Sequence, residues 1–329
     1  MRLLVTGGAG FIGSNFVRRL LGGAYPTLPA GRVTVLDKLT YSGVTANLDP
    51  VADDPRLRFV LGDICDEGLV DELMGAHDAV VHFAGETHVD RSINEAAAFV
   101  RTNVHGTQVL LDAAVRHRLG RFLHVSTDEV YGSIAHGSWD EGCALEPNSP
   151  YAATKAAAEL LVRAYHRTHE LPTLVTRCSN NYGPYQFPEK VVPLFIIRLM
   201  EGGTLPLYGD GRHVRDWLHV DDHCRAVAAV LAGGRPGEVY NVGGGTELTN
   251  RQLAERLLTA CGAGPDRIRH VEDRRGHDRR YSVDTRKIET ELGFKPHIGF
   301  EHGLAATVEW YRARRDWWEP LRDRAEVLR

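Results

Sequence analysis

Short apolar runs alternate with longer stretches of mixed polarity along the first half of the chain. Apolar runs of this length are typical of strands that are buried on both faces of a parallel sheet. The longer stretches between them have the apolar periodicity of helices. We therefore predict strands at 3–6, 33–37, 57–60, 79–83, 122–126 and 173–177, and helices at 13–21, 67–75, 93–118 and 150–169.

Strands that alternate with helices predict βαβ units, and hence an α/β fold with a Rossmann-type, doubly wound parallel sheet over residues 1–180. From residue 181 the pattern changes to loops rich in proline and glycine, which predicts a smaller, interleaved C-terminal lobe within 181–329. A helix at 222–232 and a strand at 238–242 return to the earlier pattern, so 217–243 is assigned to the sheet domain. The second lobe then consists mainly of residues 181–216 and 244–329, with helices at 249–261 and 300–318.

A glycine-rich turn follows the first predicted strand, with the sequence GGAGFIG at residues 7–13. Glycines allow the backbone to turn tightly and to approach a diphosphate, while the N-terminus of the next helix faces that charge. The strand before the motif and the helix after it favour a dinucleotide site over a simple tight turn. Gly13 is followed by Ser14 and not by lysine, which excludes the phosphate-binding loop of nucleotide hydrolases.

An acidic residue, Asp37, ends the second predicted strand. Its carboxylate can accept hydrogen bonds from both adenosine ribose hydroxyls and would repel a 2′-phosphate, so this position favours NAD over NADP. Lys38 beside it carries a positive charge and so weakens the argument against NADP. Asp63 and Ile64 follow the third strand, where the adenine edge would lie, and a loop cap is the alternative role for Asp63.

Tyr151 and Lys155 lie four residues apart at the start of a predicted helix and so share one of its faces. A neighbouring ammonium favours the phenolate and is expected to lower the pKa of Tyr151, which makes it a base for an alcohol or sugar hydroxyl. Thr127 lies at the end of the fifth predicted strand, the edge where ligands of such sheets bind. Asp128 and Glu129 follow, and adjacent carboxyls in different environments can supply an acid and a base. A solvated strand end is the alternative for this pair.

Composition narrows the function classes further. The 329 residues have a formal net charge of −4, which argues against a general polyanion-binding surface. No apolar stretch approaches the roughly 20 residues that span a membrane. The five cysteines include no CxxC pair, which favours a reducing, cytoplasmic setting. His219 and His223 have helical spacing, but no third ligand motif accompanies them, so we predict no metal site and a helix N-cap at 220–222.

These features resemble the extended short-chain dehydrogenase/reductase superfamily, and further segments narrow the resemblance to its dTDP-glucose 4,6-dehydratase family. It extends from residue 1 to about residue 318, and the triplet at 127–129 is its most specific element. Where the family usually has Ala-Glu-Ser, this chain has Gly85-Glu86-Thr87, which affects the packing around the cofactor or sugar. The segments that carry the resemblance are HFAGETHVDRS at 82–92, STDEVYG at 126–132, NNYGP at 180–184, LPLYG at 205–209 and RDW at 215–217.

The resemblance implies a dehydration of dTDP-glucose that is assisted by NAD. Tyr151, with Lys155 and Thr127 beside it, would take the proton of the 4-hydroxyl while NAD accepts hydride from carbon 4. Glu129 would then remove the carbon 5 proton, Asp128 would protonate the departing 6-hydroxyl, and the hydride would return to carbon 6. The cofactor-binding residues that it implies are Gly7, Gly10, Phe11, Ile12, Gly13, Asp37, Lys38, Leu39, Thr40, Gly43, Asp63, Ile64, Phe83, Ala84, Gly85, Thr87, Thr102, Tyr151, Lys155 and Asn181.

Later segments are expected to hold the nucleotide sugar. A diphosphate needs cationic donors, which Lys190 and Arg215 can provide. The alternative for the arginine-rich segment 274–280 is an exposed loop, and the alternative for Tyr208, as a platform for a base, is simple packing. The substrate-binding residues that we expect are Thr87, Thr127, Asp128, Glu129, Asn180, Glu189, Lys190, Val191, Pro206, Tyr208, Arg215, Asn250, Arg274, His277 and Tyr281.

The same resemblance implies a homodimer through the helices at 93–118 and 150–169, and neither nucleic acid nor a membrane is expected as a partner. Two other functions stay open: another nucleotide-sugar enzyme, either a 4-epimerase or a dehydratase of UDP-, CDP- or GDP-hexose, and a non-catalytic NAD-sensing protein. An epimerase has no use for the acidic pair, and a sensor would tolerate loss of the tyrosine or the lysine. The apolar residues expected at the dimer interface are Val109, Leu110, Ala157, Leu160 and Leu161.

Overall fold

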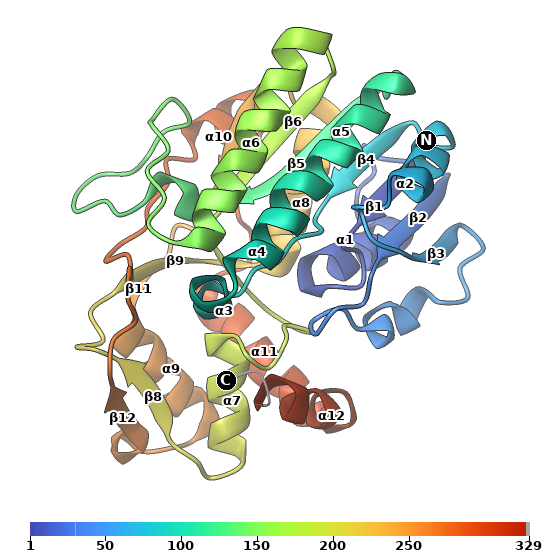
Figure 1. Cartoon of the computed structure of the whole chain (residues 1–329). Helices are drawn as coiled ribbons and strands as arrows, with labels where there is room; N and C mark the ends of the chain where they lie inside the picture. Colours follow the sequence, from blue (N-terminus) through green and yellow to red (C-terminus); the bar gives the residue numbers. More distant parts are fainter. Residues whose placement is uncertain (30, 327–329) are drawn as a thin grey trace.

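The computed structural model describes residues 1–29 and 31–326 (Figure 1). Its central parallel sheet consists of β1 (Arg2–Thr6), β2 (Arg32–Asp37), β3 (Leu57–Leu61), β4 (Ala79–His82), β5 (Arg121–Thr127), β6 (Thr173–Cys178) and β10 (Val239–Val242). The strand order is β10-β6-β5-β4-β1-β2-β3, so the chain reverses its direction of travel between β1 and β4. This order is that of a doubly wound sheet, and the predicted Rossmann-type α/β fold is confirmed.

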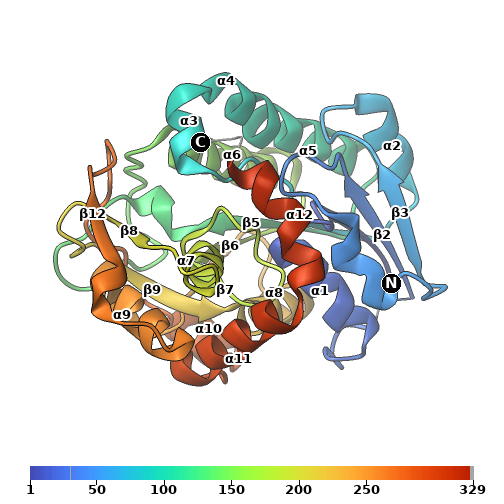
Figure 2. The same cartoon turned by 90° about the horizontal axis from the view of Figure 1, so that it is seen from below.

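Helices cover both faces of the sheet because successive residues of each strand point to opposite faces. Leu3 and Val5 pack against one helical layer and Leu4 packs against the other. The first layer contains α1 (Phe11–Leu21), α8 (Val220–Gly233) and α10 (Arg286–Leu292), and the second contains α2 (Glu67–Gly75), α5 (Gly106–Arg116) and α6 (Pro150–His169), on opposite sides of the sheet in Figure 2.

Two residues that were expected at a dimer interface, Val109 and Leu110, lie in the core between the sheet and the second layer. They are therefore not available to a partner.

The prediction of one continuous helix at 93–118 was wrong. The segment is divided into α3 (Val89–Asn94), α4 (Ala96–Phe99), a π-helical segment η2 (Val100–His105) and α5. Glu95 separates the first two with φ −135° and ψ 61°, which is outside the helical region. Single π-turns are common at functional sites, and η2 contains Asn103, whose side chain bonds both backbone groups of Glu86.

A second lobe lies below the sheet in Figure 1. Its helices share one apolar core in which Trp317 and Trp318 are buried. The single helix expected at 300–318 is two helices, because Arg314 leaves the helical region with φ −119° and ψ 47°. The lobe contains the sheet β11-β9-β7 (Glu247–Thr249, Val214–His219, Asn180–Tyr182), the pair β12-β8 (Ile268–Val271, Leu205–Tyr208), and helices α7 (Val191–Met200), α9 (Asn250–Cys261), α11 (Phe300–Ala313) and α12 (Arg315–Glu326). Short 3₁₀ segments are η1 (Thr45–Val51), η3 (Asp128–Tyr131) and η4 (Pro265–Arg267).

One segment that was expected in the second lobe belongs to the core of the sheet domain. Ile288 of α10 and Phe294 after it are buried with β1, β5 and α8, because α10 packs beside β10. The wider division of the chain into two domains stays a prediction. Among the described residues, no helix combines the length and apolar character that crossing a membrane requires.

Candidate active site

A single continuous cavity follows the carboxyl ends of the central strands, from the glycine turn after β1 to η3 and the start of α6. Most of the expected cofactor residues line it. Leu39 and Asp63 do not; each instead supports a neighbouring loop through a hydrogen bond, Leu39 N to Asp37 and Cys65 N to Asp63. The expected residues that line the cavity are Gly7, Gly10, Phe11, Ile12, Gly13, Asp37, Lys38, Thr40, Gly43, Ile64, Phe83, Ala84, Gly85, Thr87, Thr102, Tyr151, Lys155 and Asn181.

The glycine turn leaves no room for a side chain at Gly7 or Gly13. Gly7 has φ +70°, and a Cβ there would lie 2.5 Å from the backbone nitrogen of Ala84. A Cβ on Gly13 would lie 2.3 Å from the Gly7 carbonyl oxygen. The backbone therefore forms a bare cradle at the N-terminus of α1, the arrangement that receives a diphosphate.

Asp37 is fixed at the end of β2 by two backbone amides. Its Oδ2 accepts from Ala9 N and its Oδ1 from Leu39 N, both at 2.9 Å. Burial raises the pKa of this carboxyl, against the two amides and Lys38. Lys38 Nζ donates to Thr102 Oγ1 at 3.1 Å and lies 3.7 Å from Asp63, so its charge is already partly balanced. This arrangement agrees with a ribose-binding acid and not with a 2′-phosphate site.

Tyr151 and Lys155 are both buried in the first turns of α6, whose N-cap, Ser149, accepts from Ala152 N at 3.1 Å. Lys155 Nζ donates to the Val125 carbonyl oxygen at 2.8 Å, and burial lowers its pKa to about 8. The expected lowering of the Tyr151 pKa was wrong for the protein alone. Burial, then Glu129, raises that pKa well above 10, and a hydrogen bond with Thr127 only opposes the shift.

The turn η3 brings both members of the acidic pair to the cavity directly after β5. Thr127 begins the turn by accepting from Glu129 N at 3.3 Å. Burial raises the pKa of Asp128 well above its usual range, and Glu129 and Asp216 add to the shift. Burial also raises the pKa of Glu129, but Arg215, Arg274 and Lys190 oppose it. The upward pKa shift is therefore stronger for Asp128, which favours its protonated form, while nearby cations favour the ionised form of Glu129.

Five buried oxygens on cavity-lining residues have no hydrogen-bond partner among the residues that the structure describes. They are Ser126 Oγ, Asp128 Oδ2, Ser179 Oγ, Asn180 Oδ1 and Gln186 Oε1. Buried polar atoms are almost always paired, so five unpaired atoms around one cavity indicate that a polar ligand completes the site.

The expected substrate residues divide into two sets. Thr87, Thr127, Asp128, Glu129, Asn180 and Lys190 line the cavity. The remaining residues do not line it, and several are held by contacts of their own. Arg215 lies 4.2 Å from the Tyr281 ring centre, and Glu189 accepts from Arg91 at 2.8 Å. The residues of this second set are Glu189, Val191, Pro206, Tyr208, Arg215, Asn250, Arg274, His277 and Tyr281.

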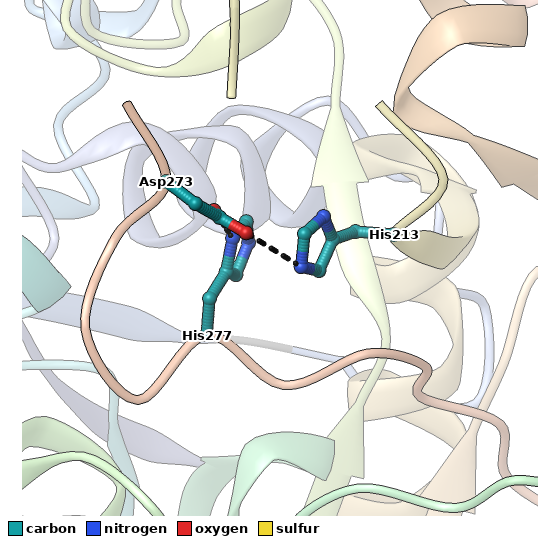
Figure 3. A group of neighbouring side chains, drawn as sticks. All are labelled: His213, Asp273 and His277. Carbon is teal, nitrogen blue, oxygen red and sulfur yellow. Dashed lines mark hydrogen bonds and ion pairs between the residues drawn. The ribbon is translucent and has the colours of Figure 1, made fainter. Parts of the chain in front are cut away.

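The described residues bring one His-Asp-His cluster together, formed by His213, Asp273 and His277 (Figure 3). Asp273 lies 2.7 Å from His277 Nδ1 and 3.4 Å from His213 Nε2. The two imidazole rings stack with 3.8 Å between centres and 14° between planes. A metal ion must lie in the plane of each imidazole that binds it, about 2 Å from the nitrogen, and nearly parallel stacked rings do not allow this. The cluster is therefore a stacked pair of rings in which His277 is hydrogen-bonded to the Asp273 carboxylate and His213 lies within ion-pair distance of it.

The two histidines considered as metal ligands from their spacing have separate partners. His219 is the N-cap of α8 and accepts from Asp221 N at 3.2 Å, so the cap lies one residue before the predicted position. The His223 ring hydrogen bonds to Asn181 Oδ1 at 2.9 Å, which links α8 to the cavity wall.

Comparison with known proteins agrees with this geometry. The family model described as GDP-mannose 4,6 dehydratase matches residues 4–307. A dTDP-glucose 4,6-dehydratase of Streptomyces niveus is 64% identical over 327 residues, which are 99% of this chain and 97% of that protein. The crystal structure of DesIV, a dTDP-glucose 4,6-dehydratase from Streptomyces venezuelae with NAD and TYD bound, has a TM-score of 0.97 at 64% identity and covers 98% of this chain and 100% of that one.

The chain belongs to the dTDP-glucose 4,6-dehydratase family. Its fold is shared more widely: a UDP-glucose 4-epimerase from Thermotoga maritima, solved with UDP-glucose, has a TM-score of 0.87 at 33% identity and covers 95% of this chain and 99% of that one. The fold therefore does not distinguish a dehydratase from an epimerase, and the residues of the cavity must do so.

Several cavity residues were missed by the sequence analysis. Ser126 and Glu86 stand inside the segments that carry the family resemblance, so their neighbours were a signal. Gly62 directly follows β3 and Cys178 ends β6, so their position at the carboxyl edge of the sheet was the signal for them. The unexpected residues are Leu36, Ser42, Gly62, Glu86, Val125, Ser126, Cys178, Ser179, Gln186 and Phe187.

Proposed function

We propose that this protein is a dTDP-glucose 4,6-dehydratase, which converts dTDP-glucose to dTDP-4-keto-6-deoxyglucose for deoxysugar synthesis and retains NAD. The observation that carries the proposal is the shared cavity of Tyr151 and the pair Asp128 and Glu129. Oxidation of an alcohol needs only the tyrosine, whereas loss of water also needs an acid and a base. Membership of the family supports the same reaction.

The cavity fits NAD. The bare glycine cradle suits its diphosphate, and Asp37, fixed by two amides, suits the adenosine ribose. When bound, NAD accepts a hydride from carbon 4 of the sugar and later returns it to carbon 6. Gly7, Gly13, Asp37, Lys155 and Asn181 are the residues that we expect to hold it, and homologous structures contain NAD.

Tyr151 takes the proton of the 4-hydroxyl as carbon 4 becomes a ketone. Its own pKa is raised by burial, so its ionisation depends on positive charge and on the hydrogen bond with Thr127. Lys155, with a pKa of about 8, carries positive charge at neutral pH and favours the phenolate.

The ketone makes the carbon 5 proton acidic, and Glu129 removes it. Asp128, kept protonated by burial, gives its proton to the 6-hydroxyl, which leaves as water. As hydride arrives at carbon 6, Glu129 returns its proton to carbon 5. The proton that Tyr151 took replaces the one that Asp128 gave, so the protein ends as it began and the sugar has lost one water.

The test is to incubate the pure protein with dTDP-, UDP-, CDP- and GDP-glucose and to follow the mass of each sugar. We expect loss of one water from dTDP-glucose and no consumption of added NAD. A Glu129→Gln variant should accumulate enzyme-bound reduced NAD and exchange the carbon 5 proton with deuterated solvent about 10²–10⁴-fold more slowly. Glu67→Gln on α2 is the control. Conversion to a 4-epimer without water loss would contradict the proposal.

A homodimer and a cytoplasmic location are part of the proposal. Ile93, Val100 and Leu160 are 40%, 51% and 56% exposed on α3, η2 and α6, which contact one another. An apolar surface of this kind supports a helical dimer interface. The five free thiols support a reducing compartment. A monomer by light scattering at micromolar concentration would contradict the dimer.

A further inference from the structure

Arg177 joins the two elements that carry the catalytic groups. It is buried in β6, directly before the cavity residue Cys178. Its Nε and Nη2 lie 2.8 and 2.6 Å from Oε2 of Glu159 on α6. Its Nη1 donates to the Tyr131 hydroxyl on η3 at 2.6 Å. One guanidinium therefore bonds both α6, which bears Tyr151, and the turn η3.

Glu159 connects the arginine to the reacting tyrosine and lysine. Positions 151, 155 and 159 are four residues apart on α6, so their side chains share one helix face. Glu159 is buried, and its Oε1 has no hydrogen-bond partner among the described residues. It is also the main group that opposes the effect of burial on Lys155 and so raises the pKa of that ammonium.

Tyr131 connects the arginine to the acidic pair. It is the last residue of the four-residue turn η3 that begins with Asp128 and Glu129. Its hydroxyl donates to Asn241 Oδ1 at 2.9 Å, its ring stacks on Trp139, and the guanidinium of Arg177 lies 4.6 Å from its ring centre. The four-residue turn η3 also packs on α6, through Val130 and Ala156, whereas the longer α6 is held along β5, β6 and α5 as well. Loss of the Arg177–Tyr131 bond should therefore move η3 more than α6.

We propose that Arg177 and Tyr131 are positioning residues that set the elimination pair, Asp128 and Glu129, relative to Tyr151. Neither touches the reacting sugar atoms in this assignment, which rests on the proposed dehydratase function. The proposal predicts a split: oxidation at carbon 4 survives their substitution and elimination does not. A purely stabilising ion pair would lower the amount of folded protein and leave the ratio of the two half-reactions unchanged.

Tyr131→Phe is the sharpest test, because it removes one oxygen and keeps the ring. We expect reduced NAD to form at close to the wild-type rate, while carbon 5 exchange and water loss slow about 10- to 100-fold, the cost of a small misplacement. Tyr240→Phe is the matched control: Tyr240 is equally buried, and its hydroxyl bonds Glu291 at 2.9 Å on the far side of β10. The control should keep the wild-type ratio.

A second pair of variants keeps the proposal testable if one of them folds poorly. Arg177→Lys can reach Glu159 or Tyr131 but has no fork to hold both, so it should show the same split at smaller size. Both substitutions break the same hydrogen bond, the one between Arg177 and Tyr131. The double variant, Tyr131→Phe with Arg177→Lys, should therefore slow elimination by less than the product of the two separate factors.

The outcomes separate the two proposals. Wild-type protein that removes no water from dTDP-glucose contradicts the proposed function. Wild-type protein that does so, with Tyr131→Phe slowing both half-reactions equally or neither, overturns the positioning role alone.

Discussion

The two walls of the cavity hold their residues in different ways. On the sheet wall, Asp37, Thr127 and Cys178 end strands β2, β5 and β6, so the sheet fixes their spacing. Beside the second-lobe wall, Arg215 and Arg274 do not line the cavity but oppose the upward pKa shift of Glu129. Contacts between loops and short strands position them, such as Arg215 with Tyr281 and Arg274 with Asp90 at 3.5 Å. We therefore expect the chemistry at the sheet wall and recognition of the nucleotide by the second-lobe residues, whose loops can adapt to a ligand.

The largest effect should come from the sheet wall. Tyr151→Phe removes the base for the 4-hydroxyl, so ketone formation should fall about 10²–10⁴-fold. The absorbance of reduced NAD after mixing with dTDP-glucose measures it. Tyr165→Phe, which removes a hydroxyl bonded to Asp112 further along α6, is the control and should stay active. If the Tyr151 variant formed reduced NAD at the normal rate, another group would be the base for the 4-hydroxyl.

The next effect concerns the cofactor alone. Gly13→Ala would put a methyl 2.3 Å from the Gly7 carbonyl oxygen and 2.9 Å from the Gly8 Cα, and backbone cannot yield cheaply. Overpacking of this kind costs roughly 1–3 kcal/mol, or about 5- to 150-fold in NAD affinity. Measurement of NAD per purified chain tests it, with Gly68→Ala as control, where the nearest atom is 3.6 Å away. A Gly13 variant that retained its full content of NAD would contradict the role of the glycine turn in binding NAD.

A smaller effect is expected at the second-lobe wall. Arg274→Gln should raise the KM for dTDP-glucose about 10-fold, since hydrogen bonds to charged groups contribute about 1.5–3 kcal/mol. NAD content should not change, and kcat should fall less than KM rises. Arg275→Gln is the matched control, because the neighbouring side chain is exposed. A loss of NAD in the Arg274 variant would show that the walls are not separate in function.

The last effect concerns acid stability, not catalysis or binding, and compares a residue of the sheet with a residue of a second-lobe loop. Burial lowers the pKa of His82 in β4 to about 3, against about 6.5 when unfolded, so the unfolded chain binds the extra proton. The free energy of unfolding should fall as pH drops from about 6.5 toward 3, by about 1.4 kcal/mol per pH unit. Denaturant unfolding at two pH values should give a shallower slope for His82→Gln. His277→Gln, on a second-lobe loop, should change the slope less because loops open locally.

Residues at strand ends and helix starts were predictable from sequence because strand order and helix spacing bring them together without further information. Asp37 and Thr127 end strands and Tyr151 lies in the first turn of α6, and their meeting in one cavity follows from the confirmed fold. The contacts around Arg215 were not predictable: Arg215 donates to the Asp278 carbonyl oxygen across 63 positions, a distance that depends on how the second lobe packs. The direction of the Tyr151 pKa shift was also not predictable, since its largest cause is burial, which depends on the whole fold.

The late return of β10 to the sheet has a consequence for synthesis of the chain. β6 ends at Cys178 and β10 begins at Val239, so 60 residues must emerge from the ribosome between them. At a synthesis rate of about 5–20 residues per second, the edge of β6 stays unpaired for about 3–12 s before β10 is available. An open strand edge of this kind is where nascent chains mispair, so we expect this interval to be the one in which the growing protein depends most on chaperones.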